Sequence, residues 1–271
     1  MAPNRDGLTR RWFLAGAAAL LLAARRAAAA APLSAGPPAP ELIENLVAAN
    51  RILADQGVLD GYGHVSARHD RDPGRYLLSR SRAPELVTAD DLMELDLDSV
   101  PVDPRGRSMY LERFIHSEIY KARPDVKAVV HHHSPSVIPF GASSVALRPL
   151  YHMAAFLIDA VPVFDIREAA GGMTDMLVST PALGQALARA LGPRAAVLMR
   201  SHGAAVVGDS LIQAVARSVY MEVNARLQAQ AIALGGEIRY LDPEEARRAQ
   251  AVIDRTLGRP WELWKRKALG K

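Results

Sequence analysis

The sequence predicts one α/β domain with a mostly antiparallel central sheet and flanking helices. Segments whose apolar residues recur at helical spacing alternate with short runs rich in β-branched residues. Short connections join strand candidates within residues 61–79 and within residues 195–207, and strands joined in this way run antiparallel. The domain spans residues 41–271, after a linker at residues 32–40 that is rich in proline, alanine and glycine.

The first predicted elements of the body are a helix and a hairpin. Residues 41–56 carry apolar side chains at helical spacing and are followed by Gly57, which favours a helix end. A turn then leads into a strand at residues 64–68, and residues 76–79 are predicted to pair with that strand. Residues 93–97 alternate apolar and acidic side chains, as a half-exposed strand does.

The rest of the body continues to alternate helices and strands. Pro124 breaks a helix predicted at residues 111–122, and a buried strand follows at residues 126–130. The further predicted helices span residues 181–191, 211–234 and 243–257, and the further strands span residues 161–164, 195–199 and 204–207. The tail carries Trp261 and Trp264.

Charge and composition exclude several classes of protein. The formal net charge is +4, but residues 1–31 hold five of the 33 basic residues and one of the 29 acidic residues. The body that follows is therefore neutral, and we expect no nucleic-acid partner. Because the sequence has no cysteine, it cannot form disulfides, thiolate metal ligands or a cysteine nucleophile.

Residues 1–31 resemble a bacterial twin-arginine export signal. Arg10 and Arg11 precede an apolar stretch at residues 12–24, which is shorter than the roughly 20 residues of a membrane span. Small residues at positions 27–31 offer cleavage sites. We therefore expect the twin-arginine export machinery to deliver the protein to the periplasm. An uncleaved membrane anchor facing the periplasm is the alternative.

Three consecutive histidines follow the strand predicted at residues 126–130. Side chains alternate faces along a strand, so His131 and His133 point the same way and His132 points the other way. Neutral imidazole is the commonest metal ligand, which makes His131 and His133 a natural half of a metal site. This stretch alone fits a polar strand end without a metal equally well. We expect His132 to be structural.

Glu112 on its predicted helix and His202 at a second strand end extend the histidine pattern. In order and spacing, Glu112, the pair His131 and His133, and the Val-Leu-Met-Arg-Ser-His-Gly run that contains His202 resemble the class II aldolase/adducin family. An Arg-Pro-Asp sequence before the histidine strand adds to the resemblance, which covers residues 41–235. The resemblance implies the family's single-domain α/β/α fold.

The resemblance also implies one divalent metal ion held by His131, His133 and His202. Zinc is the usual ion in the family, with manganese and iron as alternatives. Three neutral imidazoles leave an open coordination position, as in catalytic zinc sites. The family's helix glutamate acts as an acid/base, a role that falls on Glu112; a surface carboxylate paired with His116 is the alternative. The family's usual tetramers, with sites between subunits, imply a homo-oligomer.

The positions that hold phosphate in the sugar-phosphate aldolases of this family differ here. His64 stands at an asparagine position, Ser81 and Arg82 stand at a Thr-Gly turn, and Tyr110 with Leu111 replaces a serine pair. These differences argue against a sugar-phosphate substrate. Arg82 can instead clamp a carboxylate with two hydrogen bonds. A solvated loop arginine is the alternative for Arg82.

Two further histidines and two serines are candidates for the substrate site. His152 aligns with the family's proton-donating tyrosine, and a histidine can move a proton near neutral pH. His64 is a candidate at the pocket mouth, and for both histidines a structural role is the alternative. Ser66 and Ser134 follow strand ends and are candidates for orienting ligands. We expect His69 to be a solvated turn residue.

The resemblance predicts a metal-dependent carbon–carbon lyase that acts on a small hydroxy-carbonyl or hydroxy-acid substrate. The ion would act as a Lewis acid, and Glu112 would move the proton. Aldol cleavage is the favoured reaction, and decarboxylation of a hydroxylated aromatic or keto acid is second. An iron-dependent oxygenase and a non-enzymatic adducin-like module are the remaining alternatives.

Overall fold

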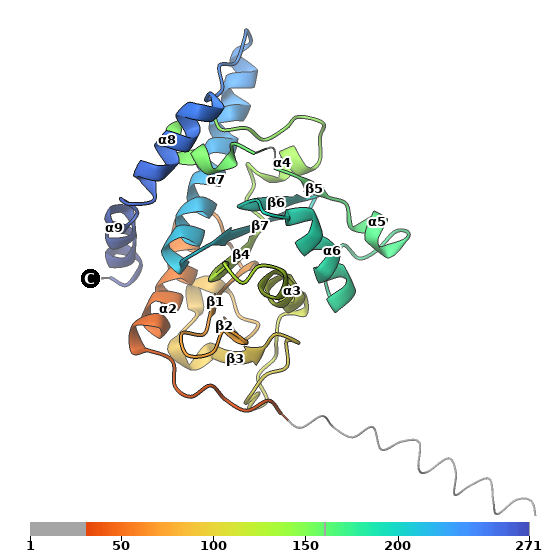
Figure 1. Ribbon diagram of the computed structural model, residues 1–271, viewed down its shortest axis with the longest axis vertical. Coiled ribbons are helices and arrows are strands. Elements are labelled where there is room, and N and C mark those ends of the chain that lie inside the picture. Colours follow the sequence, from red (N-terminus) through yellow and green to blue (C-terminus); the bar gives the residue numbers. More distant parts are fainter. Residues whose placement is uncertain (1–30, 160, 271) are drawn as a thin grey trace, which may run out of the picture. The chain divides into compact units, whose positions relative to one another are not determined.

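A seven-stranded sheet in the order β3-β2-β1-β4-β7-β6-β5 lies at the centre of the fold (Figure 1). The computed structural model describes residues 31–159 and 161–270. The strands are β1 (His64–Arg68), β2 (Arg75–Ser79), β3 (Leu92–Asp96), β4 (Ala128–His132), β5 (Val163–Phe164), β6 (Ala196–Met199) and β7 (Gly203–Gly208). Neighbouring strands are antiparallel except for β5 and β6. The predicted mostly antiparallel sheet is therefore confirmed.

Helices cover both faces of this sheet, as predicted. The α-helices are α2 (Pro40–Asp55), α3 (Phe114–Ala122), α4 (Ile138–Gly141), α5 (Ile166–Ala170), α6 (Pro181–Leu191), α7 (Leu211–Leu234), α8 (Pro243–Ile253) and α9 (Gly258–Ala268). The 3₁₀ helices are η1 (Pro84–Leu86), η2 (Ala89–Asp91), η3 (Leu111–Arg113) and η4 (His152–Leu157). Helices α2 and α7 lie on one face of the sheet, and α3 and α6 lie on the other (Figure 1).

Strand β4 shows how the sequence divides its side chains between the two faces. Ala128 and Val130 pack into the core with α2 and α7, whereas Val129 packs with α3 and α6. Continuing the alternation places His131 on the α3 side and His132 on the α7 side. His131 and His132 therefore lie on opposite faces of the sheet, as the alternation of side chains along a strand predicted.

Two predicted helices differ from the observed ones. The helix expected at residues 111–122 begins with η3, in which Glu112 has non-helical backbone angles (φ −87°, ψ 18°), and α3 itself begins at Phe114. The helix expected at residues 243–257 ends at Ile253, and the expected tail forms helix α9. Trp261 of α9 is buried against the core formed with α2, which explains why the tail is helical.

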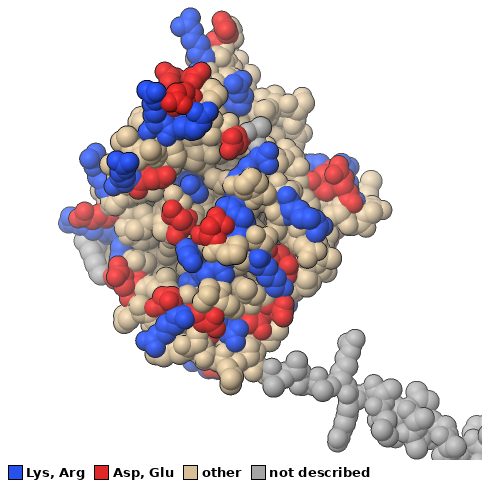
Figure 2. Space-filling view, viewed as in Figure 1, with Lys and Arg blue, Asp and Glu red and all other residues tan. Residues whose placement is uncertain are grey.

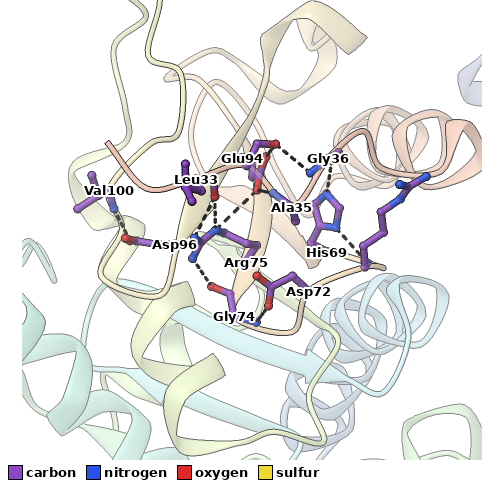
Figure 3. Close-up of polar contacts among 12 residues, drawn as sticks. Leu33, Ala35, Gly36, His69, Asp72, Gly74, Arg75, Glu94, Asp96 and Val100 are labelled. Carbon is purple, nitrogen blue, oxygen red and sulfur yellow. Dashed lines mark hydrogen bonds and ion pairs between the residues drawn. The ribbon is translucent and has the colours of Figure 1, made fainter. Parts of the chain in front are cut away.

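The segment expected to be a linker is bound to the sheet through hydrogen bonds (Figure 3). The backbone nitrogen of Ala35 donates to Glu94 Oε1 at 2.7 Å, and an Arg75 guanidinium nitrogen donates to the Leu33 carbonyl at 3.0 Å. Glu94 and Arg75 belong to β3 and β2. Residues 32–39 contain no helix or strand, yet they belong to the same compact unit as the rest of the folded body, and Pro40 already begins α2.

His69 is a correction to the sequence analysis. We expected a solvated turn residue, but His69 is only 4% exposed. Its Nε2 lies 3.1 Å from the Gly36 carbonyl, so the docked N-terminal segment is what covers the ring (Figure 3).

The predicted export signal falls almost entirely on residues 1–30, which lie outside the described residues. Within residues 31–159 and 161–270, no helix combines the length and apolar character needed to cross a membrane. Lysine and arginine are intermingled with aspartate and glutamate on the face shown in Figure 2. That distribution agrees with the neutral charge balance of the body.

Candidate metal centre

Four side chains able to bind a metal converge at one end of the sheet: Glu112, His131, His133 and His202. Their ligand atoms all lie within 4.8 Å of one another. The Nε2 atom of His133 lies 3.0 Å from the Nε2 atoms of both His131 and His202. The fold therefore brings together the three predicted metal ligands and the predicted acid/base.

The main chain holds these residues in a tight arrangement. His202 lies in the turn between β6 and β7, where Ser201 adopts a left-handed backbone (φ 53°). On one side of β4, a Cβ atom at Gly203 would collide with the carbonyl oxygen of His132. On the other side, a Cβ at Gly63 (φ +84°) would lie 2.9 Å from the carbonyl oxygen of His131. Both glycines are required by this close approach of neighbouring strands.

The imidazoles are oriented as metal ligands. His131 Nδ1 lies 3.1 Å from the Ala204 carbonyl, and His202 Nδ1 lies 3.1 Å from the Met176 carbonyl. A carbonyl can only accept, so each Nδ1 carries the proton and each Nε2 presents a lone pair to the centre. Burial, reinforced by the neighbouring His131 and His202 rings, lowers the pKa of His133 to about 4.

This donor set fits a divalent transition metal. Three neutral imidazoles with one adjacent carboxylate match the ligands of zinc, iron and manganese sites, and the carbonyls of Ala204 and Met176 fix the tautomers of His131 and His202. The residues that would hold the ion are His131, His133 and His202, with Glu112 beside them.

Glu112 lies in η3 with one oxygen anchored and the other facing the histidines. Its Oε1 accepts a 3.0 Å hydrogen bond from the backbone nitrogen of Val178. Its Oε2 lies 3.5 Å from His131 Nε2 and 3.6 Å from His202 Nε2. Burial raises the pKa of Glu112, but the two histidines outweigh burial and hold the pKa well below its ordinary value. The alternative pairing of Glu112 with His116 is therefore wrong.

A cavity opens from this cluster to the surface. Its lining includes Glu112, His133, His64, Ser81, Arg82 and Tyr110. The predicted substrate-binding residues His64, Ser81 and Arg82 therefore lie around the same cavity as the predicted metal ligand His133 and the predicted acid/base Glu112. Tyr110, which by resemblance stands at a serine position of the sugar-phosphate aldolases, donates a hydrogen bond from its hydroxyl to the Arg82 carbonyl at 2.6 Å. This bond ties the Tyr110 side chain to the loop that carries Arg82.

Arg82 has a partner that the sequence analysis did not anticipate. One terminal nitrogen of its guanidinium contacts both carboxylate oxygens of Asp91, at 3.0 and 3.1 Å. Arg80 holds the same carboxylate at 2.6 Å, and together with Thr88 these contacts outweigh burial and keep the pKa of Asp91 well below its ordinary value. Arg82 is therefore neither fully free nor a simple solvated loop residue. Its second terminal nitrogen and Nε have no partner among the described residues.

Two predicted site residues lie elsewhere in the described chain. Ser66 is fully buried and hydrogen bonded to His116 and Tyr120, so it does not line the cavity. His152 is exposed at the start of η4, which packs against α7 and α8, and it does not line the cavity either. Both placements correct the sequence analysis for a single chain.

Sequence reasoning missed a buried carboxylate that supports the histidine strand. Glu222 of α7 is 8% exposed and accepts hydrogen bonds from the Ser134 hydroxyl and from both the backbone nitrogen and hydroxyl of Ser136. These bonds hold the turn that directly follows His133. The signal in the sequence was a charged residue, Glu222, among apolar neighbours on a long predicted helix. The ligand-orienting role expected for Ser134 takes this indirect form.

Comparisons with known proteins agree with the geometry. The Class II Aldolase and Adducin N-terminal domain family matches residues 44–229. Decarboxylase tropJ of Talaromyces stipitatus is 35% identical over 251 residues, covering 84% of this chain and 94% of that protein. The 3,4-dihydroxyphthalate decarboxylase of Arthrobacter keyseri is 33% identical, covering 73% of this chain and 82% of that protein. The L-fuculose 1-phosphate aldolase structure from Glaciozyma antarctica is 25% identical with a TM-score of 0.70, covering 87% of this chain and 96% of that chain.

The fold and the converging histidines define an α/β protein of the class II aldolase type. The chain belongs to the class II aldolase/adducin family. The predicted fold and family are thereby confirmed. The predicted carbon–carbon lyase is supported as well, through the decarboxylation that the sequence analysis ranked second, since the relatives from Talaromyces stipitatus and Arthrobacter keyseri are named decarboxylases.

Proposed function

We propose that the protein is a divalent-metal-dependent decarboxylase of a hydroxylated aromatic acid. The observation that carries this proposal is a three-histidine centre at the base of a cavity whose phosphate-binding positions are occupied by His64, Ser81-Arg82 and Tyr110. Two relatives named decarboxylases, one of them acting on 3,4-dihydroxyphthalate, support it. Zinc is the proposed ion, with manganese or iron as alternatives.

When bound, the ion supplies Lewis acidity, drawing electron density from the substrate oxygens that it binds. Glu112 lies beside this position and takes the proton of a substrate hydroxyl. As the bond to the carboxylate breaks, carbon dioxide leaves and the electron pair stays on the ring carbon. Glu112 then returns its proton to that carbon, and the product oxygen takes a proton from water. A proton therefore replaces the carboxylate on the ring carbon, water supplies the one proton that is consumed and is left as hydroxide, and no oxidant or reductant is needed.

The cavity walls suit an aromatic acid. Met109, Leu111 and Leu177 line the cavity and offer apolar contacts to a ring. Arg82 also lines the cavity, and we propose that its nitrogens not bonded to Asp91 bind the substrate carboxylate. Aldol cleavage becomes the second candidate, because the cavity lacks the family's phosphate contacts. The complete set of metal-binding residues argues against a non-enzymatic adducin-like role.

The test is release of carbon dioxide by the metal-loaded protein. Dihydroxybenzoates and 3,4-dihydroxyphthalate are the substrates to offer, with fuculose-1-phosphate as the comparison. We expect carbon dioxide and the corresponding phenol from an aromatic acid and no aldehyde from the sugar phosphate. Oxygen uptake coupled to turnover would favour the oxygenase alternative. Cleavage of fuculose-1-phosphate without any decarboxylation would reject the proposal.

We further propose that the protein is exported to the periplasm by the twin-arginine pathway. The support is the pair Arg10 and Arg11 before a short apolar stretch. Replacing both arginines with lysine should retain the precursor inside the cell, as cell fractionation would show. Mature protein in the periplasm from the double variant would reject export by this route, and tight membrane association would favour an anchor.

We also propose a homo-oligomer, a tetramer by resemblance to the family. His152 is exposed and lies outside the cavity of its own chain. Its predicted proton-transfer role therefore requires it to reach the cavity of another subunit. Light scattering on the purified protein would give the subunit number, and a monomer with full activity would exclude this role for His152.

A further inference from the structure

A chain of four buried polar side chains runs from the cavity into the space between β1 and α3. His64 Nδ1 lies 2.6 Å from His116 Nε2, and His116 Nδ1 lies 2.6 Å from the Ser66 hydroxyl. The Ser66 hydroxyl lies 2.8 Å from the Tyr120 hydroxyl. All four residues are at most 3% exposed, and His64 is the member that lines the cavity. We call these four residues the relay.

The side-chain periodicities of strand β1 and helix α3 bring the four residues of the relay together. His64 and Ser66 are two apart on β1 and therefore share the face of the sheet that α3 covers. His116 and Tyr120 are four apart on α3 and therefore share one side of that helix. The polar pair on the strand meets the polar pair on the helix in an otherwise apolar layer. Tyr76 stacks on the His116 ring and closes it off.

The hydrogen bonds of the relay can be assigned a direction. The Tyr120 hydroxyl has the Ser66 hydroxyl as its only hydrogen-bond partner among the described residues. Tyr120 must therefore donate to Ser66, because its buried proton would otherwise have no acceptor. Ser66 then donates its own proton to His116 Nδ1.

The direction fixes the tautomer of both imidazoles. With a proton received at Nδ1, His116 carries its own hydrogen on Nε2 and donates it to His64 Nδ1. The hydrogen of His64 therefore lies on Nε2, which has no acceptor in the described parts of the chain. The reverse direction would leave the Tyr120 proton buried without an acceptor and would present a bare nitrogen to the cavity.

We propose that Tyr120, Ser66 and His116 are positioning residues that hold His64 as a neutral imidazole, with its Nε2–H donating a hydrogen bond to an anionic oxygen of the substrate. This inference rests on the proposed function, because it assumes a substrate bound beside the metal-binding histidines. The His64 ring lies 5.0 Å from the ring of His131, between centroids, so the donor is next to the metal centre.

The chemistry of this position favours an anionic acceptor. A neutral donor beside a dication adds no positive charge, whereas an imidazolium there would be repelled. A hydrogen bond from a neutral donor to a charged oxygen is stronger than one to a neutral oxygen. The acceptor has two sources in a hydroxylated aromatic acid, its carboxylate or the hydroxyl oxygen that loses its proton. Both present the same chemistry to His64.

The test compares two matched serine variants of the zinc-loaded protein. Ser66→Ala removes the donor to His116. Ser117→Ala is the control, because Ser117 is also fully buried and its hydroxyl accepts a 2.8 Å hydrogen bond from Ser99 but makes no hydrogen bond to the relay. The dissociation constants of catechol and of 2,3-dihydroxybenzoate are measured for each protein. We expect Ser66→Ala to weaken binding about tenfold or more relative to the control, since a hydrogen bond to a charged group contributes about 1.5–3 kcal/mol.

The pattern across the two probes identifies the oxygen. If only 2,3-dihydroxybenzoate binds more weakly to Ser66→Ala, the acceptor of the His64 hydrogen bond is the carboxylate. If both probes lose affinity equally, the acceptor is the hydroxyl oxygen beside the metal. Tyr120→Phe keeps the aromatic ring and should weaken binding of the probes in the same pattern, but to a smaller extent. It provides the test if Ser66→Ala does not fold. Binding that matches the Ser117→Ala control for both probes would overturn the inference.

Nitrogen NMR of the histidine rings supplies a readout that needs no ligand. In the zinc-loaded protein we expect His64 to be protonated on Nε2, and in Ser66→Ala we expect a mixture of tautomers. Protonation of His64 on Nδ1 in the unmodified protein would overturn the inference whatever the probes do. If the ring spectra are as expected but neither probe binds, the proposed aromatic substrate fails instead.

Discussion

The carboxylate of Glu112 is anchored by the backbone nitrogen of Val178, which donates a 3.0 Å hydrogen bond to Oε1. This bond fixes the rotation of the carboxylate and leaves Oε2 facing His131 and His202. A free glutamate on a helix surface would lack such an anchor. The side chain is therefore pre-positioned for proton transfer beside the metal-binding histidines.

Glu112→Gln tests this role with little change in shape. The amide oxygen can still accept from Val178, but the amide cannot take a proton. We expect full metal occupancy and an unchanged fold, with turnover reduced roughly 10²–10⁴-fold, the usual contribution of a positioned acid/base. Metal analysis and turnover should be measured on the same sample. Weakened metal affinity with nearly intact turnover at saturating metal would assign Glu112 as a ligand instead.

The three metal-binding histidines should be individually essential for the ion. His131→Ala, His133→Ala and His202→Ala should each lose bound metal, because two imidazoles hold a divalent ion poorly. His132→Phe is the control, since His132 lies on the opposite face of β4. Metal content after dialysis measures the effect. Full metal occupancy in the His202→Ala protein would show that His202 is not a metal ligand.

Glu222 should support the metal site from a distance. Glu222→Gln weakens the acceptor that holds Ser134 and Ser136, and thereby loosens the turn after His133. We expect about tenfold weaker metal affinity, the lower end of the range for outer-shell partners. Asn224→Leu is a control on the same helix, because Asn224 binds the backbone at Arg148 instead. Equal metal affinity in Glu222→Gln and the unmodified protein would contradict this support.

Arg82 and Arg80 form a matched pair for testing carboxylate binding. Both bind Asp91 and their side chains are similarly exposed, at 32% and 34%, but Arg82 lines the cavity. Arg82→Met should raise the KM of a carboxylated substrate about tenfold, at the lower end for a hydrogen bond to a charged group because the site is partly exposed. Arg80→Met should leave KM nearly unchanged. Equal effects would mean that both act only through Asp91.

The buried histidines His116 and His132 predict acid sensitivity. Burial, reinforced by the neighbouring His131, lowers the pKa of each to about 3. Between about pH 6.5 and 3 the unfolded chain binds protons that the folded chain does not. The free energy of unfolding is therefore at its full value above pH 6.5 and falls as the pH drops, by up to about 1.4 kcal/mol per pH unit for each histidine.

His132→Phe isolates one of these two contributions. It keeps an aromatic ring in the buried position but removes the titrating group, so stability should fall less steeply with acid. Denaturant unfolding of the metal-free protein between about pH 4 and 7 measures the slope. A slope identical to that of the unmodified protein would show that His132 does not contribute.

Local periodicity was sufficient to predict much of the metal centre. The two-residue period of a strand placed His131 and His133 on one side and His132 on the other, as observed. It could not show that Glu112 lies in a 3₁₀ turn, because the apolar pattern of residues 111–122 fits one continuous helix equally well. The start of α3 depends on packing against the sheet, which is not a local property.

The predictions that failed depended on contacts between distant segments. Ser66 looked like a strand-end ligand, but α3 crosses over it and buries it. His69 looked solvated, but residues 33–36 cover it. His152 lies at the start of η4, which packs against α7 and α8 far along the chain, so its proton-transfer role stays a prediction that requires a second subunit. Spacing along the chain carries no information about which distant segment covers a residue.

The close approach at Gly63 and Gly203 has a consequence for the choice of ion. These glycines let the neighbouring strands press against the backbone of His131 and His132 from both sides, so the main chain sets the spacing of the ligand rings. A cage of this kind cannot expand to take the six to eight oxygen ligands that calcium prefers, at about 2.3–2.6 Å. We therefore expect the protein to discriminate among ions by the close packing of its backbone as well as by the identity of its ligands.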